Sequence, residues 1–489
     1  MIVSIRANDL PSIARASVLG RVHVQLSPSQ RLDFQSSESQ QLLRAAPNGC
    51  ILSSFPITTL AQSNEMEQAC VGWLNRSAET VVLAGAPELV VAVAERLPRS
   101  RVFYRLPSEM PLSDALALIA SETLGQVVSG FEVSLASQGP QQFVQTCQQL
   151  RTAAKRANDE KHGYGHGFDT TLIVVPSAED AKVLPSSTVG VLDKMGIHIL
   201  INAPLGLFPA TDTTAVSTAT TGITLEPTSS SSTSSTAAAT TAATAATTAT
   251  TAATTTTTTN ISNVGLNVIS CLRTDRPDGL FATVVCDECG VALGLVYSSG
   301  ESICESIRTG RGVYYSRSRN GLWRKGATSG AIQELVLISY DCDSDALRFS
   351  VRQLGAPPSF CHTGNRSCWG PAKGLRALQQ VLQSRLESAP EGSYTRRLYN
   401  DEGLLRNKLL EEAQELSEAT EMDHVAAEAA DVVYFTMVAA VKGGASLEQI
   451  EAHLDRRTLK IKRRPGNAKP ERIAAAAAEL EAIRAAKKE

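Results

Sequence analysis

A chain of 489 residues is too long for one hydrophobic core to keep growing, so its length predicts two to four domains. The hydrophobic share of 43%, charged share of 19% and net charge of −3 are typical of a soluble globular protein and indicate no general attraction to nucleic acid or acidic membranes. The first residues lack the pattern of a secretory leader, and ten cysteines spread over the chain favour reduced thiols over a disulfide framework. We therefore expect a cytoplasmic protein with no membrane or nucleic-acid partner.

Residues 1–210 alternate short apolar runs with helical patterns. The strand-like runs include 80–84, 101–104, 171–175 and 198–201, and the helical patterns include 87–97 and 141–157. This alternation predicts an α/β domain with a mostly parallel sheet. The region contains no glycine-rich phosphate-binding motif and no dense cluster of catalytic residue types. We expect it to be a scaffold, or a domain that lost an ancestral active site.

A change of composition separates this region from the rest of the chain. Ser, Thr and Ala fill almost every position from 211 to 259, and no apolar periodicity remains. Such a segment cannot bury enough surface to offset the entropy of ordering it. We interpret residues 211–260 as a disordered linker.

Two further domains follow the linker, and together they make the predicted fold multidomain. Residues 261–372 are predicted to form a β-rich (α+β) domain, because short β-branched or aromatic runs are separated by turn residues. These runs are 281–285, 291–297, 312–316, 335–340 and 346–351, with one helix at 302–308. From Gly374 onward the apolar period becomes helical, so residues 373–489 are predicted to form an all-α domain that ends in an Ala-rich charged tail.

The central domain gathers metal-ligating residue types in two segments. These are Asp341, Cys342, Asp343 and Asp345 in the first, and Cys361, His362 and Cys368 in the second. If residues 340–346 are extended, the three aspartates share one face and Cys342 points to the other. Three thiols leave a zinc position open for water, as hydrolytic sites do, and carboxylates suit Mg²⁺. An isolated acidic triplet is also typical of a solvated turn.

A second cysteine pair is expected to be unrelated to metal binding. Cys286 and Cys289 have the spacing of half a structural zinc site, but no second CxxC or HxxxH follows at the required distance. We expect them to be ordinary thiols in or beside a strand.

Four motifs of the central domain occur together, at 315–319 (YSRSR), 322–330 (LWRKGATSG), 341–345 (DCDSD) and 361–368 (CHTGNRSC). Over about residues 265–370 they resemble phosphoribosyl-AMP cyclohydrolase, a histidine-biosynthesis enzyme that opens a purine ring. The resemblance implies that Cys342, Cys361 and Cys368 bind zinc and that Asp341, Asp343 and Asp345 bind magnesium. It also implies a homodimer whose zinc site draws on both subunits.

The chemistry of such an enzyme gives further residues a role. Zinc lowers the pKa of bound water toward about 7, so hydroxide is available at neutral pH. His362 is our candidate for carrying the proton, although a structural, hydrogen-bonding histidine would have the same position in the sequence. The predicted substrate-binding residues are Arg317, Arg319, Trp323, Arg324, Lys325, Thr328, Ser329, Gly330 and Arg366.

The C-terminal domain carries carboxylates on two successive predicted helices. Glu411, Glu412 and Glu415 have the spacing of one helix face, and so do Glu428 and Asp431 on the next helix. Such spacing is common on exposed helices, but Glu428 and Asp431 lie among apolar residues, where a carboxylate is costly to bury without a cation. Two facing groups of this kind predict a magnesium site.

The carboxylate pattern resembles the all-α nucleotide pyrophosphohydrolase superfamily. More narrowly, the segments 393–398 (SYTRRL), 401–412 (DEGLLRNKLLEE) and 428–431 (EAAD) resemble phosphoribosyl-ATP pyrophosphohydrolase over about residues 375–465. The resemblance implies that the five carboxylates hold Mg²⁺ beside the phosphates of the substrate. Lys408 and the basic run Lys460, Lys462, Arg463 and Arg464 are candidate phosphate contacts, and the last two arginines would equally suit a solvated helix end.

The two resemblances predict a bifunctional histidine-biosynthesis enzyme acting on small-molecule phosphoribosyl nucleotides, because one activity makes the substrate of the other. Fungal trifunctional proteins with a similar layout carry a following histidinol dehydrogenase; either a third domain was never present here or this chain is a fragment, so we do not infer dehydrogenase activity. The alternative is a general nucleotide pyrophosphatase fused to a non-catalytic zinc module that binds a partner.

Overall fold

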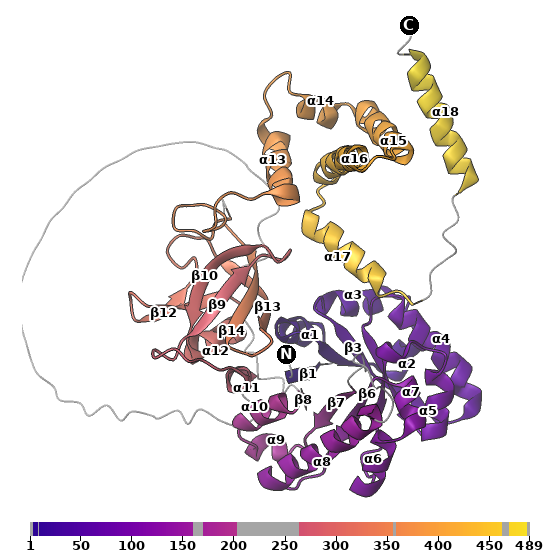
Figure 1. Cartoon of the computed structure of the whole chain (residues 1–489), viewed down its shortest axis with the longest axis vertical. Coiled ribbons are helices and arrows are strands. Elements are labelled where there is room, and N and C mark those ends of the chain that lie inside the picture. The colour runs from indigo at the N-terminus through magenta and orange to yellow at the C-terminus, as the bar shows by residue number, and fades with distance from the viewer. Residues whose placement is uncertain are drawn as a thin grey trace, which may run out of the picture.

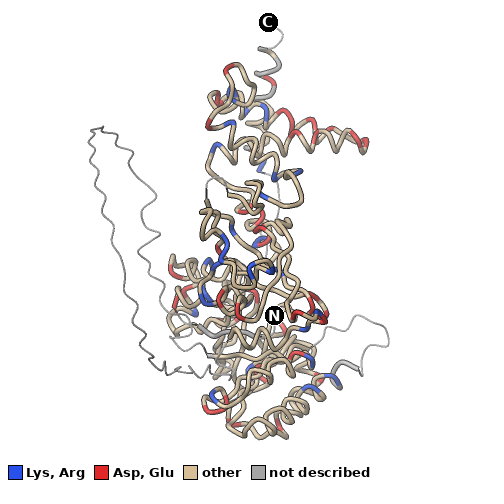
Figure 2. The backbone as a smooth tube through the Cα atoms, turned by 90° about the vertical axis from the view of Figure 1, so that its left-hand side faces the viewer, with Lys and Arg blue, Asp and Glu red and all other residues tan. Residues whose placement is uncertain are grey.

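The computed structural model of the chain describes residues 3–7, 9–159, 170–202, 264–355, 358–461 and 469–486. The linker predicted at 211–260 lies outside these residues. Figure 1 shows three bodies in chain order: a barrel, a sheet and a group of helices. In Figure 2 the barrel lies at one end of the molecule and the C-terminal helices lie at the other.

The N-terminal body is a closed barrel of eight parallel strands in chain order. They are β1 (Val3–Ala7), β2 (Val22–Gln25), β3 (Cys50–Ile57), β4 (Thr80–Gly85), β5 (Val102–Arg105), β6 (Gly130–Ser134), β7 (Thr171–Val175) and β8 (Ile197–Asn202). The ring closes where β1 pairs with β8, with Ile5 opposite Ile201. The prediction of a parallel α/β domain is confirmed, and the structure adds that its sheet closes on itself.

Helices cover the outside of the barrel, as the alternating sequence pattern requires. They are α1 (Leu10–Ala16), α2 (Pro28–Leu32), α3 (Ser37–Ala45), α4 (Ser63–Leu74), α5 (Pro87–Ala94), α6 (Leu112–Ile119), α7 (Glu122–Val127), α8 (Pro140–Asp159), α9 (Asp180–Val183) and α10 (Ser187–Lys194), with 3₁₀ turns η1 (Ser17–Leu19), η2 (Leu60–Gln62) and η3 (Arg99–Arg101). Fully buried Trp73 and Phe143 belong to the main hydrophobic core.

The interior of the barrel contains a buried polar group that the sequence patterns did not predict. Glu132 on β6 accepts a hydrogen bond from Arg105 on β5 (2.8 Å), and its other oxygen lies 4.0 Å from His23 on β2. His23 and Glu132 are completely buried. Burial of a carboxylate is costly unless it is paired, and Arg105 provides the pairing charge.

Helix α11 (Val264–Cys271) joins the barrel to the central body. It packs against α10 and β1 on one side and against α12 (Gly300–Thr309) on the other. The contact with α10 is so close that a Cβ at Gly190 would lie 2.1 Å from the Ser270 carbonyl oxygen. Glycine at this position therefore allows the two helices to meet.

The central body is a six-stranded sheet in the order β12-β11-β10-β9-β14-β13. The strands are β9 (Phe281–Cys286), β10 (Ala292–Ser298), β11 (Val313–Ser316), β12 (Gly321–Arg324), β13 (Gln333–Tyr340) and β14 (Ala346–Gln353). Neighbouring strands are antiparallel except β9 and β14. Helix α12 packs on this sheet. The predicted β-rich domain and its helix near 302–308 are confirmed, whereas α11, within the same predicted range, was not expected.

The C-terminal body consists of helices, as predicted. They are α13 (Gly374–Ser388), α14 (Tyr394–Asn400), α15 (Glu402–Glu418), α16 (Met422–Lys442), α17 (Leu447–Thr458) and α18 (Pro470–Ala486). Its own core is small and includes Leu382, Leu398, Phe435 and Val438. Asp401 begins α15 by accepting a hydrogen bond from the Leu404 N–H at 2.8 Å, as N-cap aspartates do.

Contacts hold the three bodies together. Asn48 of the barrel donates to the Val336 carbonyl (2.9 Å), and the Tyr340 hydroxyl donates to Asp193 (2.8 Å). Arg101 of the barrel donates to the carbonyl of Leu459, which follows α17, at 2.8 Å. The barrel therefore contacts both domains that follow it.

Candidate metal centres

Cys361 and Cys368 lie close together in the loop after β14. The Cys361 N–H donates to the Asn365 carbonyl (2.9 Å), and the Cys368 N–H donates to the Leu293 carbonyl of β10 (2.8 Å). The backbone of the loop is therefore held at both cysteines. The Thr363 hydroxyl donates to Cys361 Sγ at 3.1 Å and lowers the pKa of that thiol. Burial and the neighbouring Cys361 raise the pKa of Cys368. A lowered pKa favours the thiolate, which is the form that binds metals.

Lys325 lies beside these thiols instead of on an open surface. Only 8% of the residue is exposed, and its ammonium group donates to the Ala331 and Ser359 carbonyls at 3.4 Å each. Burial lowers the pKa of Lys325, while Cys368 and Cys361 are near enough to oppose that shift. The structure thus puts one predicted phosphate contact next to the predicted zinc ligands.

The acidic triplet lies in an exposed turn, so the condition that residues 340–346 are extended is not met and the alternative of a turn holds. Strand β13 ends at Tyr340 and β14 begins at Ala346, so the segment reverses the chain, with Ser344 in the left-handed region at φ 68°. The carboxylates of Asp341, Asp343 and Asp345 still come within 4.8 Å of one another. The charges of Asp343 and Asp341 raise the pKa of Asp345. Such mutual repulsion would be relieved by a divalent cation.

Cys342 shares this turn but does not join the other thiols. Its side chain is exposed. Two groups of three or more potential metal ligands have all their ligand atoms within 4.8 Å among the described residues; both consist of carboxylates, and Cys342 belongs to neither. One copy of the chain therefore does not assemble all three predicted zinc ligands.

Two of the predicted substrate residues, Arg317 and Trp323, line a groove of the central sheet. The groove has a volume of about 560 Å³ and is lined by Tyr297, Tyr315, Arg317 and Trp323, among others. The Arg317 guanidinium lies 4.1 Å from the centre of the Tyr297 ring, a contact that the sequence motifs did not predict.

The remaining predicted residues have varied surroundings. Arg319, Thr328, Ser329 and Gly330 are exposed, as is His362, whose Nδ1 lies 3.8 Å from Cys361 Sγ. Arg324 pairs with Glu305 (3.1 Å). Arg366 pairs with Asp287 (3.0 Å).

A second cluster forms where α15 packs against α16. Ligand oxygens of Glu412, Glu428 and Asp431 lie within 4.8 Å of one another, and Glu412 is 4% exposed. The buried Oε2 of Glu428 has no hydrogen-bond partner among the described residues. A buried, unsatisfied carboxylate oxygen beside two further carboxylates fits a cation site.

Charged neighbours surround this cluster. Lys408 donates to Glu411 (3.0 Å) and to Glu412; although burial lowers the pKa of Lys408, these hydrogen bonds outweigh it and the pKa is raised. Burial and the charges of Glu412, Glu428 and Glu411 raise the pKa of Glu415. Glu411 and Glu415 therefore flank the three clustered carboxylates.

Sequence reasoning missed one neighbour of this cluster. His424 Nε2 lies 3.2 Å from Glu428 Oε1, and its i, i+4 spacing could have identified it. Lys460 follows α17, whereas Lys462, Arg463 and Arg464 lie outside the described residues.

Comparison with known proteins connects both clusters to named families. Phosphoribosyl-AMP cyclohydrolase matches residues 294–370, and phosphoribosyl-ATP pyrophosphohydrolase matches residues 375–458. A histidine biosynthesis trifunctional protein from Kluyveromyces lactis is 54% identical over 205 residues, which are 42% of this chain and 26% of that protein. A histidine biosynthesis bifunctional protein from Schizosaccharomyces pombe is 53% identical over 197 residues, which are 40% of this chain and 46% of that protein.

A shorter relative is covered over most of its length. The histidine biosynthesis bifunctional protein HisIE from Parasynechococcus marenigrum is 37% identical over 183 residues, which are 33% of this chain and 81% of that protein. By contrast, the chain matches about a quarter of the length of the trifunctional relatives. The chain therefore belongs to the family of bifunctional histidine biosynthesis proteins, with its phosphoribosyl-AMP cyclohydrolase and phosphoribosyl-ATP pyrophosphohydrolase domains one after the other in residues 294–458.

Proposed function

We propose that this chain catalyses two successive hydrolyses. The helical domain converts phosphoribosyl-ATP into phosphoribosyl-AMP and pyrophosphate, and the central domain then opens the adenine ring of phosphoribosyl-AMP by adding water. One observation carries this proposal. The carboxylate cluster lies in the segment that matches phosphoribosyl-ATP pyrophosphohydrolase, and the thiol pair lies in the neighbouring segment that matches phosphoribosyl-AMP cyclohydrolase.

The carboxylate cluster supports the first step. Glu412, Glu428 and Asp431 would hold Mg²⁺, which supplies charge neutralisation for the phosphates. Lys408, hydrogen-bonded to Glu411 and Glu412 beside the cluster, would contact phosphate. Water attack on the phosphate chain then needs only positioning and charge stabilisation.

The thiol pair supports the second step. Cys361 and Cys368 would hold zinc together with Cys342, and Asp341, Asp343 and Asp345 would hold Mg²⁺. Zinc supplies the acidification of water that hydrolysis of an aromatic ring carbon requires. His362 is exposed beside Cys361, where it can carry a proton between substrate and solvent. Arg317 and the groove around Tyr297 would hold the substrate.

A comparison of substrates tests the first step. We expect the purified chain to release pyrophosphate from phosphoribosyl-ATP much faster than from dCTP or dUTP. Equal rates would contradict the biosynthetic assignment of the helical domain and support a general nucleotide pyrophosphatase.

We further propose that the active form is a homodimer. Apolar residues on α13 and α16 are exposed, among them Val381 (45%), Leu386 (46%) and Val433 (39%). Helix α16 is also apolar and long enough to cross a membrane by length and composition, with 22% of that window buried. Because Glu428 and Asp431 lie in the same helix, a second copy of the chain suits its exposed apolar residues better than lipid.

Complementation between two inactive variants tests the shared zinc site. Cys342→Ser and Cys361→Ser should each abolish ring opening alone. Co-expressed, they should regain measurable activity, because a mixed dimer can combine Cys342 of one copy with Cys361 and Cys368 of the other. Absence of complementation in a confirmed mixed dimer would contradict a site formed between subunits.

A further inference from the structure

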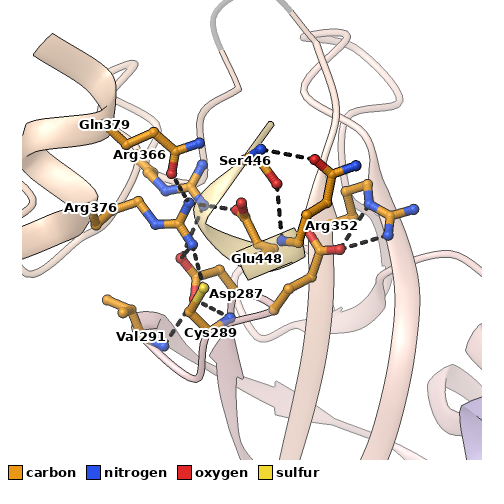
Figure 3. A network of polar contacts seen from close by, with 11 residues as sticks. Asp287, Cys289, Val291, Arg352, Arg366, Arg376, Gln379, Ser446 and Glu448 are labelled. Atoms are coloured by element: carbon orange, nitrogen blue, oxygen red, sulfur yellow. Dashed lines mark hydrogen bonds and ion pairs between the residues drawn. The ribbon is translucent and has the colours of Figure 1, made fainter. Parts of the chain in front are cut away.

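A buried carboxylate lies where the central domain meets the helical domain. Asp287, in the turn between β9 and β10, is 1% exposed, and its Oδ2 contacts two guanidinium groups. The distances are 3.0 Å to Arg366 and 3.3 Å to Arg376. Figure 3 shows both arginines, which come from different domains, converging on Asp287.

The turn itself orients this carboxylate. Asp287 Oδ1 accepts hydrogen bonds from the N–H groups of Cys289 (3.1 Å) and Val291 (2.9 Å), and the Asp287 N–H donates to the Val291 carbonyl (2.9 Å). Both carboxylate oxygens are thus engaged, one by the turn and one by the arginines. The CxxC segment, which the sequence left without a role, serves to present Asp287.

Arg376 attaches the helical domain to this turn. The residue lies in the first turn of α13, is 7% exposed, and donates to Cys289 Sγ at 2.9 Å. It also pairs with Glu448 of α17 and donates to Gln379 at 3.1 Å. Two helices of the pyrophosphohydrolase domain are therefore tied to one turn of the cyclohydrolase domain (Figure 3).

Arg366 attaches the thiol-bearing loop to the same carboxylate. It lies between Cys361 and Cys368 in the sequence, and its carbonyl accepts from the Phe360 N–H at 3.2 Å. Its guanidinium group has Asp287 as an ionic partner. This ion pair adds a side-chain contact to the backbone hydrogen bonds that hold the loop at Cys361 and Cys368.

We propose that Asp287 is a positioning residue that couples the two domains: the helical domain, through Arg376 and Asp287, holds Arg366 and the predicted zinc-binding loop in place. This proposal rests on the proposed cyclohydrolase function. Removing Arg376 leaves a buried carboxylate with one partner fewer, so the turn and Arg366 rearrange toward solvent. Residues that support metal ligands in this way typically change metal affinity or activity by about 10- to 100-fold when replaced.

The test uses the full-length chain and two variants, Asp287→Asn and Arg376→Met. We expect ring opening to slow about 10-fold or more in both, and zinc to be lost faster to a chelator, while pyrophosphate release stays at the wild-type rate. Arg376→Lys keeps the positive charge but not the planar guanidinium with its several N–H donors, so it should lose less ring opening and less zinc than Arg376→Met. If Arg376→Met does not fold, Arg376→Lys is measured in its place.

Glu288→Gln is the matched control. Glu288 is the neighbouring residue in the same turn, but its partner Arg352 (2.6 Å) belongs to β14 of the same domain, so this variant should keep wild-type ring opening. The proposal is overturned if the Arg376 variants keep wild-type zinc retention and ring opening, whatever their melting temperature. If the proposed cyclohydrolase function itself is wrong, the wild-type chain will not open the ring of phosphoribosyl-AMP, and this outcome is distinguishable from failure of the positioning proposal.

Discussion

Replacing Glu428 by glutamine will reduce pyrophosphate release from phosphoribosyl-ATP by about 100- to 1,000-fold, the range measured when one preorganised electrostatic group, such as an oxyanion-hole donor, is removed from an active site. Glu428 is a member of the carboxylate cluster, and its buried Oε2 has no hydrogen-bond partner among the described residues. Glutamine keeps the shape of the side chain but removes one of three charges that would hold Mg²⁺. Pyrophosphate release under saturating Mg²⁺ measures the effect.

The other activity and a matched variant serve as controls. Glu428→Gln should still open the ring of added phosphoribosyl-AMP, because the thiol pair lies in another domain. Glu418→Gln changes an exposed carboxylate at the end of α15, whose partner is Gln414 (2.7 Å), and should leave pyrophosphate release unchanged. Near wild-type release by Glu428→Gln would exclude the carboxylate cluster as the active site.

Replacing Cys361 by serine will remove tightly bound zinc and stop ring opening, so that phosphoribosyl-AMP accumulates from phosphoribosyl-ATP. Cys361 carries the thiol whose pKa is lowered by the Thr363 hydroxyl, and a serine hydroxyl is a far weaker zinc ligand than a thiolate. Zinc per subunit, measured by elemental analysis, and the ratio of the two products report the change.

A second cysteine provides the comparison for this variant. Cys304 lies on α12 and belongs to none of the clusters described above. Cys304→Ser should keep both the zinc content and the ring-opening rate. If Cys361→Ser retains one zinc per subunit and full activity, the thiol pair is not the metal site.

Local spacing determined much of the candidate sites. Glu428 and Asp431 lie together because i, i+3 positions share a face of α16, whereas Glu412 of α15 joins them only because the two helices pack against each other. The acidic triplet is clustered although residues 340–346 are not extended, since residues within five positions stay close in a turn as well as in a strand. The turn itself follows from the pairing of β13 with β14, which the spacing of the aspartates does not reveal.

Long-range contacts determined what the sequence patterns missed. Asp287 is an unremarked residue of a CxxC segment until folding places it between Arg366 and Arg376. His23 and Glu132, on β2 and β6, meet only because the sheet closes. Hydrophobic periods and short residue spacings do not predict these contacts, because the contacts depend on how whole helices and strands pack against one another.

By itself, the amino-acid sequence of this protein determined the order of its three structured regions, their α/β, β-rich and helical character, and the residue types of both candidate metal sites. These features follow from hydrophobic periods and from spacings of a few residues, which act within single elements. Only the tertiary structure decided that the first region closes into a barrel, that Cys342 lies apart from its partner thiols, and that Asp287 joins two domains. The physical reason is that each of these depends on strand pairing, chain reversal or burial of charge between segments far apart in the sequence.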